Sequence, residues 1–554
     1  MIIKQWLNSG SPWIWLNAAA VSTCLILVLG ILGLVAVRGL GHYWPSDVAQ
    51  IQYREKDGTQ QVITGEITDH NEISAARAKD AGYLDADIGS NTTVEQVLLK
   101  IGNRDVGGMD FRWILTNNIQ QSSYPEQLVV LERREWGNFY GSLLAVKSGG
   151  KNIAQGADAW VVAQQRIAAA LEIHDDIKQL EKKQIGAVNY ALDRLRLKQR
   201  KLELQKAWTD TAKQAVATEK AAYQVDYKRY QEQLKSLYAK ANQESLVIKT
   251  GDGIERDIPI GKIVKAYQPN GMGIFTKIGH YFGKLGEFLS EDPREANTEG
   301  GIFPAIFGTV LMVMLMAVIV TPFGVIAAVY LREYAKQGFT TRLIRIAVNN
   351  LAGVPSIVYG VFGLGFFVYI LGGKIDHLFY PESAPAPVFG TPGLMWASIT
   401  LALLTLPVVI VATEEGLSRI PKSIREGSLA LGATKFETLW LTVLPMASPA
   451  MMTGLILAVA RAAGEVAPLM LVGVVKLAPT LPLDGNFPFL HLDRKFMHLG
   501  FHIYDVGFQS PNVEAARPIV YATSLLLVTV IVGLNLTAVT IRNHLREKYR
   551  ALEG

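Results

Sequence analysis

Six long apolar stretches constrain this chain more than any other feature of its sequence. They cover approximately residues 13–37, 303–331, 344–372, 393–413, 448–475 and 518–541. Runs of about 17 to 25 apolar residues are long enough to cross the hydrocarbon core of a bilayer as helices. We therefore expect an α-helical polytopic membrane protein with six transmembrane helices. Residues 1–38 form its N-terminal anchor helix, which is too long for a cleaved secretion signal.

The composition excludes several other classes of protein. Charged residues make up 19% of the 554 residues, below the roughly 25% usual for soluble domains. The 54 Lys and Arg residues exceed the 49 Asp and Glu residues by only 5, which is too mild a balance to indicate a nucleic-acid partner. Cys24 is the single cysteine, so an intramolecular disulfide and a thiolate metal cluster are both excluded.

The basic residues beside the apolar stretches predict the orientation of the chain, because positively charged short loops stay in the cytoplasm. Lys and Arg collect after the second, fourth and sixth stretches, whereas the loop at 373–392 carries only Lys374. We expect both termini, and the 546–554 tail, to be cytoplasmic. The polar region 39–300 then lies in the periplasm of a bacterial inner membrane, opposite the basic loop 414–447.

The 39–300 region shows two patterns. Residues 39–156 alternate short β-prone stretches with turn signals, which predicts a small β-rich region. Residues 157–245 are rich in Ala, Lys, Gln, Glu and Leu, with an apolar stripe that includes Ile173, Ile177 and Leu180. Such a stripe requires a partner helix, so we expect a coiled-coil hairpin that turns near 208–210. β-prone residues resume within 246–300, which leads back to the membrane.

The residues expected of a catalytic chain are missing. No Gly-x4-Gly-Lys-Ser/Thr loop, Gly-x-Ser-x-Gly elbow or His-Glu-x-x-His motif occurs in the sequence. His491, His498 and His502 have spacings of seven and four, which suit no common zinc pattern. We therefore expect no catalytic residue, no metal site and no cofactor held by this chain.

A cytoplasmic segment just before the fifth stretch is suited to passing force to the membrane. It contains Glu426, then Gly432-Ala433, then Leu444-Pro445. A short helix, a turn permitted by Gly432 and a second helix stopped by Pro445 would present a surface fixed to two transmembrane helices. This segment is the predicted coupling element.

This spacing resembles the EAA loop of the permeases of ABC importers. Together with Gly300–Thr309, Gly353–Gly360 and Ala460–Leu469, it is similar to the PstA-type permease of phosphate importers. The resemblance covers about 300–545, with 301–545 as the transmembrane domain, and leaves the insert unmatched. It implies a type I ABC importer permease fold, in which the coupling element sits in a cleft of a separate ATPase subunit.

Arg461 and Glu465 are four residues apart within the fifth apolar stretch. A charge at the bilayer centre costs about 2.5 to 3.5 kcal/mol, so both side chains should face the bundle interior, and this spacing puts them on one helix face. A guanidinium offers a fork of donors that matches phosphate oxygens. Our hypothesis is that Arg461 contacts the passing anion while Glu465 holds or competes for Arg461. A purely structural ion pair that closes a gate is the alternative.

The resemblance further implies an assembly in which this chain is a non-catalytic permease that moves inorganic phosphate into the cytoplasm. Its partners would be a PstC-type permease, a PstB-type ATPase dimer that binds ATP and Mg, and a periplasmic phosphate-binding protein. Two alternatives stay open. The substrate could be another tetrahedral oxyanion (sulfate, molybdate or phosphonate), or the chain could be a membrane-anchored coiled-coil scaffold or sensor.

Overall fold

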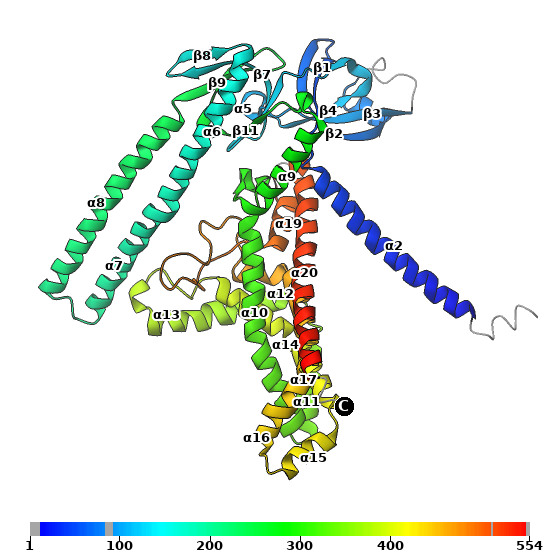
Figure 1. Cartoon of the computed structure of the whole chain (residues 1–554), viewed down its shortest axis with the longest axis vertical. Helices are drawn as coiled ribbons and strands as arrows, with labels where there is room; N and C mark the ends of the chain where they lie inside the picture. The colour runs from blue at the N-terminus through cyan, green and yellow to red at the C-terminus, as the bar shows by residue number, and fades with distance from the viewer. Residues whose placement is uncertain (1–10, 84–91, 511–512, 550–554) are drawn as a thin grey trace, which may run out of the picture. The chain divides into compact units, whose positions relative to one another are not determined.

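The structure is a computed structural model that describes residues 11–83, 92–510 and 513–549, and it forms two compact units (Figure 1). The first unit comprises Met1–His42 and Ile302–Gly554 and contains the long apolar helices. The second unit is the insert Tyr43–Gly301. The outermost parts of the predicted 1–38 anchor and 546–554 tail lie outside the described residues.

Among the residues that the structure describes, six helices of the first unit are long and apolar enough to span a membrane, as predicted. They are Pro12–Gly41, Phe303–Tyr334, Ser356–Phe379, Leu394–Arg419, Lys435–Gly464 and Ala516–Lys548. The main helical segments within them are α2 (Ser11–Gly41), α10 (Phe303–Val329), α12 (Ser356–Phe362), α14 (Leu394–Arg419), α17 (Leu444–Gly464) and α20 (Val513–Tyr549). α14 is the most buried of the six spans and packs against both α10 and α17, so it forms the centre of this unit.

The third span begins later than the predicted 344–372. Residues Phe339–Leu351 form a separate helix, α11, whose Arg342 side chain is exposed. A turn at Gly353 follows, and Ser356 begins the span directly after Pro355. The residue before a proline disfavours the α-helical region, so Val354-Pro355 separates the amphipathic helix from the apolar one. Apolar content alone had merged the two.

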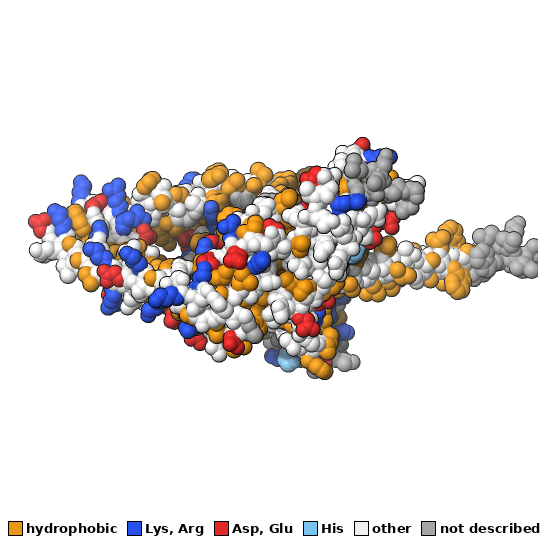
Figure 2. All heavy atoms as spheres, turned by 90° about the horizontal axis from the view of Figure 1, so that it is seen from above, with side chains coloured by type: hydrophobic (Ala, Val, Ile, Leu, Met, Phe, Trp, Pro, Cys, Tyr) orange, Lys and Arg blue, Asp and Glu red, His pale blue; other side chains and the backbone are white. Residues whose placement is uncertain are grey.

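The first span, α2, is exposed along most of its length. Its side chains are predominantly hydrophobic, as the projecting rod in Figure 2 shows. The C-terminal end of α2 packs on α20, where a Cβ atom on Gly39 would lie 2.8 Å from the backbone nitrogen of Ala522. Glycine is therefore required at this close helix contact.

Two antiparallel sheets organise the insert. The first has the order β4-β3-β2-β1-β5 and the second β10-β9-β7-β6-β11, with β8 also paired to β7. The first sheet contains β1 (Val48–Arg54), β2 (Gln60–Ser74), β3 (Thr93–Lys100), β4 (Phe111–Leu115) and β5 (Ile119–Ser123). The second contains β6 (Leu128–Arg133), β7 (Phe139–Ser148), β8 (Lys151–Gln155), β9 (Glu244–Lys249), β10 (Glu255–Pro259) and β11 (Ile263–Tyr267).

A long helical hairpin connects β8 to β9, which both pair with β7. Its first arm is α6 (Ala157–Gln179), a π-helical turn at Leu180–Ile185 and α7 (Gly186–Leu204), and its second arm is α8 (Asp210–Ala241). The arms are linked by Glu181 and Tyr238 at 2.9 Å and by Lys198 and Glu219 at 3.5 Å. The first turns of α6 pack on the second sheet through Ala159, Ala163 and Ile167.

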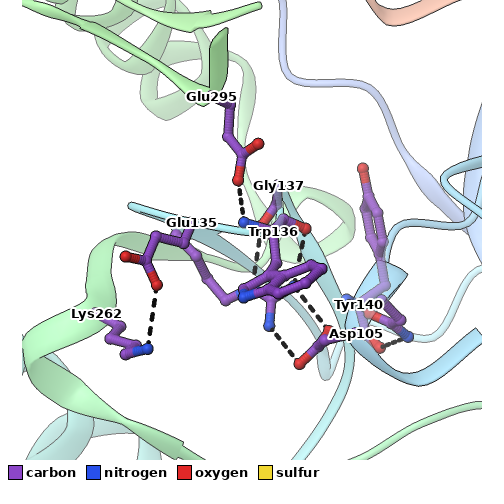
Figure 3. Close-up of polar contacts among 9 residues, drawn as sticks. Asp105, Glu135, Trp136, Gly137, Tyr140, Lys262 and Glu295 are labelled. Atoms are coloured by element: carbon purple, nitrogen blue, oxygen red, sulfur yellow. Dashed lines mark hydrogen bonds and ion pairs between the residues drawn. The ribbon is translucent and has the colours of Figure 1, made fainter. Parts of the chain in front are cut away.

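The return segment of the insert is pinned to the loop after β6. The Glu295 carboxylate accepts a hydrogen bond from the Trp136 backbone N–H (Figure 3). The same loop is braced by Lys262, which lies 3.1 Å from Glu135. The helix before this segment, α9 (Ile274–Ser290), is followed by the short pair β12 (Pro293–Arg294) and β13 (Glu299–Gly300). The exit of the insert is thus fixed to its second sheet.

Candidate functional site

Arg461 lies in the last turn of α17, and Glu465 is the residue that caps this helix. The Arg461 Nε and Glu465 Oε1 atoms are 3.7 Å apart, and the two side chains are 33% and 20% exposed. This separation is longer than that of a hydrogen bond, so the contact is a loose ion pair. Such a pair leaves more of the guanidinium N–H groups available to another acceptor than a bidentate carboxylate contact would.

The helix carrying this pair is not continuous, contrary to the prediction of one span over 448–475. α17 ends at Gly464, Glu465 has an extended backbone with ψ 134°, and the short helix α18 (Ala467–Val472) starts anew. Pro468 in the first turn of α18 lacks an N–H and cannot continue the hydrogen-bond ladder of α17. Glu465 therefore reaches Arg461 from a helix break and not from the same helix face.

The neighbours of Arg461 along α17 are apolar. Ala458, Val459 and Ala462 on the same helix are buried in the core of the unit, together with Tyr359 of α12. Tyr359 lies close enough to interact with the charge of Arg461. A partly exposed guanidinium with one loose carboxylate partner, set among apolar side chains, is suited to holding an anion.

Glycines of the third span allow close contacts within the chain, as Gly360 and Gly363 show. A Cβ atom at Gly360 would lie 2.6 Å from the Pro468 Cα atom, and one at Gly363 would lie 2.4 Å from the Thr400 hydroxyl. These contacts bring α12 and its continuation against α18 and α14. Close packing next to the break thus depends on small residues.

The predicted coupling element begins with α15 (Lys422–Ala430), on which Glu426 is exposed. Gly432 follows with φ +90°, a conformation that strongly favours glycine. Ala433 comes next, and Thr434 then starts a new helix through a capping box with Glu437. The predicted helix, glycine turn and second helix are all present.

Pro445 does not stop the second helix, contrary to the prediction. The helix runs without a break from Lys435 to Gly464 and includes Leu444 and Pro445 at the start of α17. The turn just before, Thr438–Val443, is π-helical. Its altered hydrogen-bond pattern accommodates a residue without an N–H, whereas a regular α-helix interior would not.

Sequence reasoning missed Arg425, the residue that anchors α15. Its guanidinium donates to the carbonyls of Leu417 and Ile420 at 2.7 Å each and pairs with Glu333 at 2.9 Å. The two carbonyls lie at the C-terminal end of α14, and Glu333 lies in the π-helical turn Tyr330–Tyr334 that continues α10. A basic residue in a basic loop carries no sequence signal for such a role, because its partners are mainly backbone carbonyls.

The coupling element exposes several large apolar side chains. Leu431, beside the glycine turn, is 91% exposed, and Phe436 and Trp440 stack on each other with ring centroids 6.2 Å apart. Exposed apolar side chains gathered on one element mark a surface for a protein partner.

The three histidines considered as metal ligands each contact a different partner. His491 pairs with Asp484 at 2.9 Å, the Nδ1 atom of His498 accepts from the Gly500 N–H at 3.1 Å, and His502 lies 3.4 Å from Thr523. Among the described residues, no group of three or more His, Cys, Asp or Glu side chains is arranged to hold a metal ion.

Residues 320–550 match the family described as binding-protein-dependent transport system inner membrane component, and this range includes both Arg461 and the coupling element. The chain is 35% identical over 246 residues to the phosphate transport system permease protein PstA 1 of Mycobacterium tuberculosis, which covers 44% of this chain and 71% of that protein. The chain is 32% identical over 255 residues to the phosphate transport system permease protein PstA of Yersinia pestis, and this match covers 46% of this chain and 76% of that protein.

Against the probable ABC transporter permease protein YqgH of Bacillus subtilis, the chain is 32% identical over 203 residues and spans 62% of that protein. Among solved structures, the MetNI methionine ABC transporter in an inward-facing conformation is similar with 19% identity and a TM-score of 0.33. That likeness covers 44% of this chain and 94% of the MetNI chain.

Proposed function

Since this chain belongs to the binding-protein-dependent transport system inner membrane component family and is of the PstA type, we propose that it is the permease subunit through which an ATP-driven importer moves inorganic phosphate into the cytoplasm. The observation that carries the proposal is the 35% identity to a phosphate permease over 71% of its length. The six apolar spans fit a multi-pass protein of the inner membrane.

In this proposal both termini are cytoplasmic and the insert is periplasmic. The exposed Arg342 and the basic coupling element favour the cytoplasmic side for the ends of the spans that they join. A periplasmic insert lies on the side from which a binding protein would deliver its anion.

The chain works with three kinds of partner: a PstC-type permease, a PstB-type ATPase dimer that binds ATP and Mg, and a periplasmic phosphate-binding protein. The exposed apolar side chains of the coupling element support docking of the ATPase. Arg425 ties this element to the ends of two spans, so movement of a docked ATPase would reach the helices.

Arg461 is the proposed contact for the passing anion, and Glu465 is its resting partner. One guanidinium cannot offset a doubly charged anion in a low-dielectric channel, so the second permease must contribute further donors. The apolar surroundings and the loose 3.7 Å pair support this role over that of a tight structural ion pair.

The test is anion-stimulated ATP hydrolysis. The complex would be purified through this chain, reconstituted with the binding protein and assayed with phosphate, sulfate, molybdate and a phosphonate. We expect phosphate to raise hydrolysis several-fold over each of the others. Stimulation by sulfate or molybdate in its place would make this a permease for another oxyanion. Recovery of the chain without any ATPase would favour the scaffold or sensor alternative.

A further inference from the structure

Helix α9 of the insert directs its charged side chains toward the rest of the insert and exposes apolar ones, which is the reverse of a helix in water. Surface helices normally bury an apolar stripe and expose polar side chains. In α9 the exposed positions are all uncharged: Ile274, Phe275, Thr276, Ile278, Gly279, Phe282, Gly283, Gly286, Leu289 and Ser290. Phe275 is 87% exposed and Phe282 is 64% exposed. The outward face of α9 is therefore an apolar face without a partner within the insert.

The charged side chains of α9 are engaged with the rest of the insert. Lys277 pairs with Asp47 at 2.5 Å, Lys284 binds Glu132 and Glu287, and Glu287 also pairs with Lys265 at 2.8 Å. Burial acts to raise the pKa of Glu287, but Lys284 and Lys265 hold this pKa below its ordinary value, so the carboxylate stays ionised. These contacts fix which face of α9 points outward.

Chain connectivity keeps α9 close to the membrane boundary. The ring of Tyr43 packs on Phe288 of α9 with centroids 5.2 Å apart, and Trp44 lies 6.1 Å from Tyr281. Tyr43 is only two residues beyond Gly41, the end of the first membrane span, and two residues reach about 7 Å at most. The same C-terminal end of α9, which carries Phe288, is joined to the span that begins at Phe303 by a short segment.

We infer that α9 lies in the periplasmic membrane–water interface, with its apolar face inserted among phospholipid acyl chains. An interfacial helix buries such a face at the boundary of headgroups and acyl chains. Trp44 packs beside Tyr281 of α9, and aromatic residues of these types are enriched at this depth. Because the cations of α9 are paired within the insert, the contact with lipid should not require anionic headgroups.

The inference can be tested with a spin label on the complete transport complex in lipid vesicles. Cys24 would first be replaced by Ser, and a single cysteine then introduced by Phe282→Cys or Phe275→Cys. The matched control is Val225→Cys, because Val225 is 68% exposed on α8 of the same insert. The measurement is the accessibility of the label to oxygen, which partitions into lipid, relative to a water-soluble nickel chelate.

We expect the ratio of oxygen to nickel accessibility to be several-fold higher at both α9 positions than at position 225. The ratio should be the same in phosphatidylcholine vesicles with and without phosphatidylglycerol. A ratio equal to that of the control would overturn the inference, because the face would then be in water. Protection from both reagents would also overturn it and would point to a protein that covers this face.

Discussion

At the scale of single residues, one guanidinium carries most of the proposed chemistry. Arg461 is part-exposed among apolar side chains, and Glu465 is held at a distance that keeps their contact weak. An anion with several oxygens can compete for this guanidinium because it offers bidentate acceptors that the carboxylate does not use here.

Replacing Arg461 by Gln should lower phosphate uptake about tenfold to a hundredfold while the complex still assembles. The reason is the loss of a charge-assisted hydrogen bond, which contributes about 1.5–3 kcal/mol, and about 1.4 kcal/mol corresponds to a factor of ten. Radiolabelled phosphate uptake by vesicles measures the effect. Arg342→Gln removes the same charge from the exposed face of α11 and should leave uptake near the wild-type rate. Normal uptake by the Arg461 variant would mean that the pair is structural only.

The sequence was sufficient to predict that Arg461 and Glu465 lie close together, because a charged pair in an apolar run has few other ways to be neutralised. It was not sufficient to predict the helix break between them. Proline is also found within α10 and α14 without ending either helix, so Pro468 alone did not distinguish a break from a continuing helix. The role of Arg425 depends on where two helices end in space, which no local pattern contains.

At the scale of elements, the coupling element depends on the conformation of one turn. Gly432→Ala places a Cβ in a left-handed conformation that costs about 1–2 kcal/mol, although no other atom lies within 4 Å of that Cβ position. We expect the turn to open, with reduced uptake and with ATP hydrolysis less dependent on phosphate. The readout is the ratio of phosphate transported to ATP hydrolysed.

Gly427→Ala is the matched control for this variant. Gly427 lies within α15, and a Cβ there also meets nothing within 4 Å. Its replacement should stabilise the helix by about 0.5–1 kcal/mol and preserve coupling. Equal coupling ratios for the two alanine variants would contradict a role for the Gly432 turn.

At the scale of the whole molecule, hydropathy was enough to find six spans, because length and apolarity are what the bilayer selects. The boundaries at Pro355 and Gly464 were missed because each break lies within a predominantly apolar stretch of the sequence. In the insert, β-prone stretches and helix-forming composition could be separated locally. β8 and β9 pair with the same strand although their residues are more than ninety positions apart, since Ser148 pairs with both Lys151 and Glu244. This pairing cannot be read from local patterns.

Shortening the hairpin distinguishes the importer from the scaffold alternative. Glu181 and Tyr238 link the arms near their base, so residues 184–235 can be replaced by a short Gly-Ser linker without touching the contacts of α6 with the sheet. We expect the shortened protein to transport phosphate at close to the wild-type rate. Removal of the full 157–245 segment should instead destabilise the insert, since Ala159, Ala163 and Ile167 belong to its core. Loss of uptake in the shortened but well-assembled protein would argue for a working role of the outer hairpin.

The attachment of the hairpin to two neighbours of a single strand also limits how its length can evolve. The residues that link its two arms must stay opposite each other. They are Glu181 with Tyr238 and Lys198 with Glu219. An insertion in one arm would shift the register of every contact between the arms beyond it. The hairpin can therefore lengthen only by matched additions to both arms or by an insertion at the tip. Natural variation can therefore lengthen or shorten the hairpin in matched steps while the sheet at its base remains unchanged.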